Sequence, residues 1–102
     1  MSRGRFADPI RRQLDLFEVE ERALILDCDE AERRYDAADR DEAEERYSEY
    51  LDLVDTGTEL LAELRDNFAS AMDEETAEEY EQAFNRAVAV RLPRFALQIG
   101  DA

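Results

Sequence analysis

Apolar side chains recur along this chain at steps of three and four residues, which is the spacing of one face of an α-helix. One such stripe consists of Ala43, Tyr47, Tyr50, Leu51, Val54, Leu61, Leu64, Phe68 and Met72. A second, shorter stripe consists of Ala77, Tyr80, Phe84, Ala87 and Val88. Only three glycines and two prolines interrupt the chain. The pattern therefore predicts an all-α protein built from long helices.

Capping residues indicate where these helices begin and end. Asp8 followed by Pro9 is a strong helix start, because aspartate accepts backbone N–H bonds and proline has no N–H to satisfy. The stretch from Asp36 to Asp41 has no large apolar residue, so we expect a tight turn there, with Asp39 and Asp41 both available as caps of the next helix. Asp73 should cap the last helix. The expected elements are a basic N-terminal arm at 1–8, helices at 9–37, 41–71 and 73–92, and a C-terminal tail at 93–102.

We expect the first two helices to form a long antiparallel hairpin, with the shorter third helix packed on it in an arrangement like a three-helix bundle. Because no glycine or proline enforces the turn, one continuous helix from Pro9 to about Ala71 is the alternative. Gly57 lies on the apolar face of the helix expected at 41–71, where it indicates either close approach by another helix or a tolerated weak point. The tail is expected to fold back over the bundle through three apolar residues, Phe95, Leu97 and Ile99.

The helix expected at 9–37 carries apolar residues on two opposite sides. Its main face consists of Ile10, Leu14, Phe17, Leu24, Ile25, Cys28, Ala31 and Tyr35. The opposite face consists of Leu16, Val19, Ala23 and Leu26. A helix in a simple hairpin needs only one apolar face. We therefore predict that the second face is the interface of a homodimer, which completes the bundle; in the alternative, the third helix and the tail cover it within one chain.

Charge is the strongest compositional feature of this 102-residue chain, which is long enough for a single domain. Its 28 acidic residues outnumber 13 basic ones, all of them arginine, and the net charge is -15. Residues 1–12 and 82–102 are net basic, whereas residues 13–81 hold 26 of the acids. The absence of lysine is typical of a GC-rich coding sequence or of life at high salt. Part of the acidity can therefore be background and not function.

The residue types exclude most catalytic chemistry. The chain has no histidine, so neither a histidine base nor a histidine metal ligand is available. It has no glycine-rich phosphate-binding motif. Glu21 is the best candidate for a carboxylate-only metal site, although a structural ion pair explains it better. The thiol pKa of Cys28 should be raised by its acidic neighbours, so we expect a buried small residue and not a nucleophile.

These observations favour a non-enzymatic protein that acts through apolar helix faces, as a homodimer and as an adaptor for a protein partner. No catalytic residue and no cofactor is predicted. The alternative is an acidic regulator that mimics nucleic acid and occupies a basic surface of its partner; a carboxylate-only metal-binding bundle ranks below both. Direct nucleic-acid binding is disfavoured by the net charge. Without an apolar leader or membrane segment, a cytoplasmic location is expected.

Overall fold

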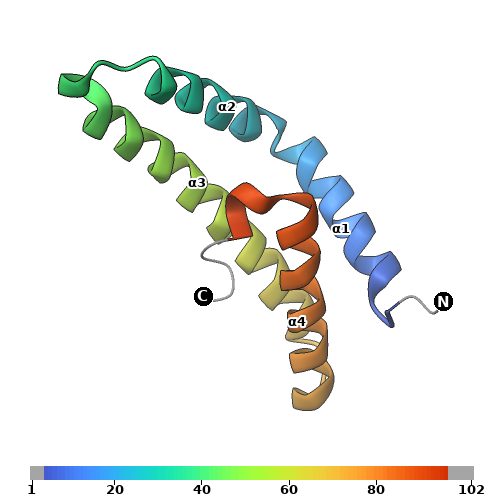
Figure 1. The fold of residues 1–102 in the computed structure, drawn as a ribbon. Coiled ribbons are helices and arrows are strands. Elements are labelled where there is room, and N and C mark those ends of the chain that lie inside the picture. Colours follow the sequence, from blue (N-terminus) through green and yellow to red (C-terminus); the bar gives the residue numbers. More distant parts are fainter. Residues whose placement is uncertain (1–3, 97–102) are drawn as a thin grey trace.

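The computed structural model describes residues 4–96, and every regular element in this part of the chain is helical. The elements are α1 (Ala7–Glu20), α2 (Arg22–Asp36), α3 (Arg40–Ala69), α4 (Glu74–Arg91) and a short 3₁₀ turn, η1 (Pro93–Phe95) (Figure 1). The expected all-α class is confirmed. Within these residues, no helix is long and apolar enough to cross a membrane.

The helices α2 and α3 run side by side in opposite directions, joined by residues 37–39 (Figure 1). The alternative of one continuous helix is therefore wrong. Asp39 occupies the N-cap position of α3, where its carbonyl oxygen accepts bonds from the N–H groups of Glu42 and Ala43. At about 1.5 Å per residue, α3 spans most of the 50 Å length of the molecule. It is the element along which the others are arranged.

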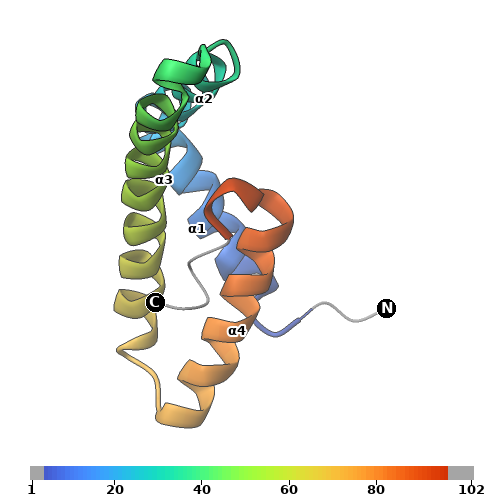
Figure 2. The same ribbon diagram turned by 60° about the vertical axis from the view of Figure 1, so that its left-hand side comes forward.

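The helix expected at 9–37 is divided at Glu21, which corrects the prediction. Glu21 has φ -106° and ψ 27°, outside helical geometry, although its N–H still bonds to Phe17 O at 2.8 Å. Beyond this point α2 follows α3, while α1 swings away and lies against α4 (Figures 1 and 2). On this side of the break α4 contacts both α1 and α3, and η1 contacts α3.

The N-terminal helix also begins earlier than its capping signals indicate. It starts at Ala7, so Asp8 lies inside the first turn and the expected arm at 1–8 is shorter. Phe6 is buried and packs edge-on against Tyr80, with ring centroids 5.5 Å apart. The aromatic contact therefore anchors the start of α1 on α4. At the start of α4 itself, Asp73 Oδ1 accepts the expected capping bond from Thr76 N.

The core lies where α1, α3, α4 and η1 meet. Its fully buried side chains are Leu14, Leu61, Tyr80, Phe84, Val88 and Phe95, together with Cys28. Phe95 folds back over the bundle, as the sequence predicts, and it packs on Gly57, a contact that the sequence did not predict. Thr58 Oγ1 donates to the carbonyl oxygen of Phe95 at 3.3 Å. Leu97 and Ile99, the other two apolar residues of the expected tail, lie outside the described residues.

Three aromatic residues expected on buried faces are exposed instead: Tyr35, Tyr47 and Phe68. Tyr35 and Tyr47 stack on each other across α2 and α3 at 5.0 Å between ring centroids. This contact lies near the turn, where no third helix covers the pair. The two rings thus shield each other, and the apolar pattern overestimated burial at this end.

Two arginines near the C-terminal end of α4 connect it to the divided first helix. Arg91 pairs with Asp15 and Glu18, both on α1. Hydrogen bonds to Glu18 and then Asp15 raise the pKa of Arg91. These ion pairs therefore hold the C-terminal end of α4 against α1.

Arg94 makes the corresponding contacts beyond the break. Its Nη1 lies 2.9 Å from Asp29 Oδ1 and its Nη2 lies 3.2 Å from Glu32 Oε1, both on α2, while Nε donates to Tyr50 Oη on α3 at 3.2 Å. Burial opposes the charged form, but bonds to Asp29 and Tyr50 outweigh it and raise the pKa of Arg94. Arg91 and Arg94 therefore hold α1 and α2 on either side of Glu21.

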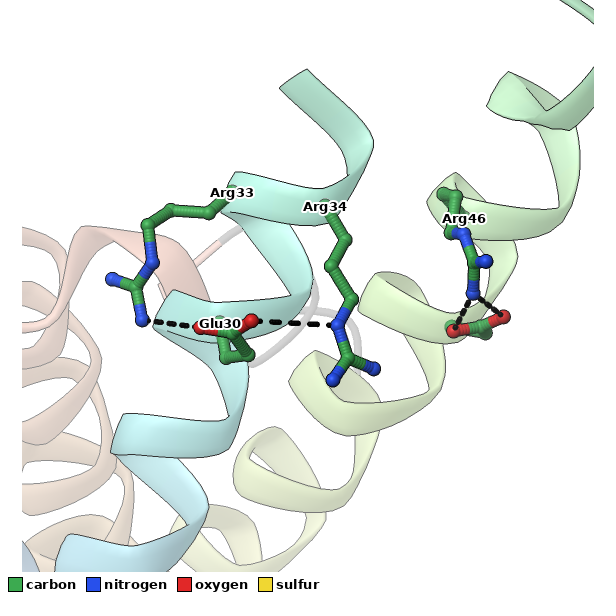
Figure 3. Close-up of polar contacts among 5 residues, drawn as sticks. Glu30, Arg33, Arg34 and Arg46 are labelled. Carbon is green, nitrogen blue, oxygen red and sulfur yellow. Dashed lines mark hydrogen bonds and ion pairs between the residues drawn. The ribbon is translucent and has the colours of Figure 1, made fainter. Parts of the chain in front are cut away.

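Replacing Arg94 by glutamine should lower the free energy of unfolding by about 1 to 2 kcal/mol, because charged hydrogen bonds to three helical partners are lost. Urea denaturation followed by circular dichroism measures the change. The matched control is Arg33→Gln. Figure 3 shows that the ion pairs of Arg33 and Arg34 with Glu30 stay within α2, and the pair of Arg46 with Glu49 likewise stays within α3.

The Arg33 side chain is mostly exposed, so Arg33→Gln should leave the urea midpoint almost unchanged. Equal destabilisation by Arg94→Gln and Arg33→Gln would show that contacts between helices contribute nothing beyond local surface pairs.

Candidate interaction surfaces

The four residues predicted as an interface are all exposed, two on α1 and two on α2, and are here called the apolar stripe. Leu16 is 54% exposed, Val19 74% and Leu26 53%, and Ala23 between them is also exposed. Across the division at Glu21 the two helices stay linked by the bond from Ile25 N to Glu21 O. α4 packs on the other side of α1, through the faces of Ile10 and Leu14. The third helix therefore does not cover the apolar stripe.

Beside the apolar stripe, a shallow groove of about 250 Å³ separates α1 from α3. Leu16 stands at its edge, and Phe17, Leu60 and Leu64 form its apolar part. The rim is acidic and consists of Glu20, Glu21 and Glu63. The stripe and this groove together make an apolar surface bordered by carboxylates.

A second groove, which sequence reasoning missed, runs between α1 and α4 and has a volume of about 530 Å³. Its floor is apolar, and the residues that form it are Phe6, Ala7, Ile10, Leu14, Ala83, Ala87 and Val90. Its rim consists of Arg5, Arg11, Arg86 and Arg91, with Glu79 as the one acidic residue that lines it within the described chain. We call this feature the α1–α4 groove. The two net-basic ends of the chain meet here, and their charge was the only sequence signal for it.

Glu21 does not lie in a metal site, and the surroundings of Cys28 do not activate its thiol. Glu21 lies at the division of α1 from α2, and no three potential metal ligands gather anywhere within residues 4–96. Cys28 is fully buried, and burial raises its thiol pKa, with Asp29 and Asp27 adding to the effect. The raised pKa disfavours the thiolate, so Cys28 is a packing residue.

An acidic row follows the solvent side of α3 near its start. The residues that border a shallow depression there are Asp41, Glu44, Glu45, Ser48, Glu49 and Asp52. Arg46 partly neutralises the row through its bond to Glu49 at 3.1 Å. Acidic residues in the first turn, such as Asp41, also complement the positive end of the helix dipole. The row needs no partner to explain it.

The fold and these surfaces define a small acidic helical bundle with two apolar surfaces of opposite rim charge. Comparison of the chain with known families, with curated proteins and with solved structures finds no match. The functional argument therefore depends on the surfaces alone.

Proposed function

We propose that this chain is a non-enzymatic helical protein that associates with itself as a homodimer, and with other proteins, through apolar helix faces. The apolar stripe carries the proposal. Single exposed apolar residues are ordinary on protein surfaces, but several on one face beside an apolar groove are typical of an interaction site.

Removing the apolar stripe from water supplies the driving force. Leu16, Val19 and Leu26 each keep half or more of their surface exposed in the single chain, so each contributes about 1 kcal/mol or more when covered. A two-fold dimer doubles the number of side chains that are covered. Association also costs translational and rotational freedom, which makes a dimer of modest affinity the expected result.

The acidic rim opposes this association. In a symmetric contact, Glu20 and Glu63 of one copy approach carboxylates of the other, and each chain carries a charge of -15. Added salt screens this repulsion. The homodimer is therefore expected to become tighter as the sodium chloride concentration rises.

Replacing Val19 by glutamate should shift the protein from dimer to monomer, and the double variant Leu16→Glu with Leu26→Glu should do so completely. The new carboxylates would lie in the contact and repel those of the second copy. Because these side chains are exposed in the single chain, the helical circular dichroism spectrum should not change. Sedimentation equilibrium over the micromolar range measures the mass.

A wild-type protein that stays monomeric up to several hundred micromolar would refute the homodimer. Val90→Glu is the matched control, since Val90 is 85% exposed on α4 and lies outside the apolar stripe. A loss of dimer in Val90→Glu but not in Val19→Glu would assign the contact to another face.

A second candidate function is an acidic regulator that binds a basic partner, and the acidic row on α3 supports it. Carboxylates carry the same sign of charge as phosphates and can bind a basic surface in their place. Salt separates the two candidates: binding through the acidic row weakens as salt is added, whereas association through the apolar stripe strengthens.

A further inference from the structure

The α1–α4 groove combines an apolar floor with a mainly basic rim. Its floor is apolar and four arginines border it, although the whole chain carries only 13 basic residues against 28 acidic ones. From this combination we propose that the α1–α4 groove binds an acidic amphipathic helix of a partner protein. The proposal concerns a different surface from the homodimer and does not depend on it.

The floor of the groove is shaped for side chains that enter from outside. Ala83 and Ala87, one turn apart on α4, leave space that a larger residue would fill, and Ile10 and Leu14 form the opposite wall on α1. Between Ala83 and Val90 the floor covers about two turns of helix. A helix that presents apolar residues at steps of three, four and seven would place them along this length.

The rim determines the charge of the occupant. Arg5 lies 3.5 Å from Glu79 and Arg11 lies 3.5 Å from Asp8, both through exposed side chains. Arg86 forms no ion pair with any residue that the structure describes. Its guanidinium is therefore available to a carboxylate of the occupant, and the exposed pairs of Arg5 and Arg11 can exchange at little cost. Arg91 stays paired with Asp15 and Glu18 and adds no free charge to the rim.

The open side of the groove favours a helix over a lipid chain. Val90 is 85% exposed at the edge of the floor, so a fatty acyl chain lying there would keep one side in water. An amphipathic helix instead turns its polar face to water and its carboxylates to the arginines. The apolar floor equally disfavours a nucleic acid, whose backbone has no apolar side to bury.

The experiment uses the full chain and a fluorescein-labelled helical peptide of about 16 residues, long enough to form a helix, with leucines on one face and glutamates on both flanks. Fluorescence anisotropy measures binding. Val90→Glu and Arg86→Glu should each weaken binding about tenfold or more, by placing a carboxylate against the leucines or by removing the Arg86 cation from the rim. The matching peptide with lysines in place of the glutamates can bind only to the acidic surface elsewhere on the chain, so Val90→Glu and Arg86→Glu should not weaken its binding.

Two control variants separate the groove from general effects of charge and fold. Arg40→Glu changes the net charge as much as Arg86→Glu, but lies at the distant start of α3 (Figure 1). Val19→Glu makes the same chemical change as Val90→Glu on the apolar stripe. Both controls should bind the glutamate peptide within about twofold of the wild type, because neither touches the groove.

Several results would overturn the proposal. These are equal binding of the glutamate peptide by Val90→Glu and the wild type, an equal loss of lysine-peptide binding in Val90→Glu, and no binding of the glutamate peptide at several hundred micromolar. Displacement of the bound peptide by oleate at equal concentration would assign the groove to fatty acids instead. A lower oligomeric mass for Val90→Glu, with Val19→Glu unchanged, would show that a second copy of this chain occupies the groove.

Discussion

Replacing Phe95 by alanine should lower the free energy of unfolding by about 3 to 5 kcal/mol, the cost of deleting a fully buried aromatic ring. Phe95 is 2% exposed and packs edge-on against Phe17, with ring centroids 6.0 Å apart. The ring lies between α1 and α3, so its removal leaves a cavity where the divided first helix depends most on packing. Urea denaturation followed by circular dichroism measures the loss.

Because of the Phe95 ring, Gly57→Ala should change the free energy of unfolding in opposite directions in the wild type and in the Phe95→Ala variant. A Cβ at Gly57 would lie 2.8 Å from both Cδ1 and Cζ of Phe95. In the wild type, overpacking of about 1 to 3 kcal/mol outweighs the gain of about 1 kcal/mol that alanine brings to a helix. Gly57→Ala should therefore destabilise the wild type but stabilise the Phe95→Ala variant.

This comparison tests the contact directly, because the helix-propensity gain is present in both backgrounds and only the clash is removed. If Gly57→Ala stabilises both proteins by the same amount, Phe95 does not pack on Gly57. If it destabilises both equally, another neighbour restricts the position.

Raising the pH should destabilise the protein between about pH 10 and pH 12 through Tyr80. Burial raises the pKa of Tyr80 to about 12, although its hydroxyl also donates to Gln13 Oε1 at 2.9 Å. An unfolded tyrosine has a pKa of about 10, so above that pH the unfolded chain loses a proton that the folded chain retains. The stabilisation is complete below pH 10 and is lost as the pH rises through 12, by about 2 to 3 kcal/mol in all.

Urea denaturation at several pH values between about 9 and 11.5 measures this slope, and the range stays below the pKa of arginine. Because burial also raises the pKa of Cys28, the measurement is made in a Cys28→Ala background. Tyr80→Phe should flatten the slope, and Tyr47→Phe, which removes an exposed phenol, is the matched control. A slope that is the same with and without the Tyr80 hydroxyl would contradict the assignment.

The sequence was most informative where one helix face alone decides the structure. The apolar spacing predicts α3 and α4 to within two residues at each end, and Asp73 marks the start of α4 because its cap is a local contact. The break at Glu21 could not be predicted in this way. The apolar main face runs through it without a glycine or proline, and α4, against which α1 packs, lies some 60 residues further along.

Of the two candidate surfaces, one could be predicted from the sequence of a single helix and the other depends on how distant helices pack. The exposure of Val19 follows from a helix with two apolar faces, which is visible in the sequence. The α1–α4 groove is not visible there, because Ala83 and Ala87 look like ordinary helix formers until Ile10 is placed opposite them. In the sequence Arg86 cannot be distinguished from other surface charges, because only the fold brings it close to Arg5 and Arg11.

The contacts that Arg91 and Arg94 make with α1 and α2 affect the order in which the chain folds during synthesis. The pairing of α2 with α3 joins neighbouring segments, so it can form as soon as both have left the ribosome. α1 packs against α4, and Arg91 binds Asp15 and Glu18 from more than 70 residues away. α1, the first helix to be made, must therefore wait for the last described segment before it can dock. During this interval, its apolar main face is available to chaperones and to other nascent chains.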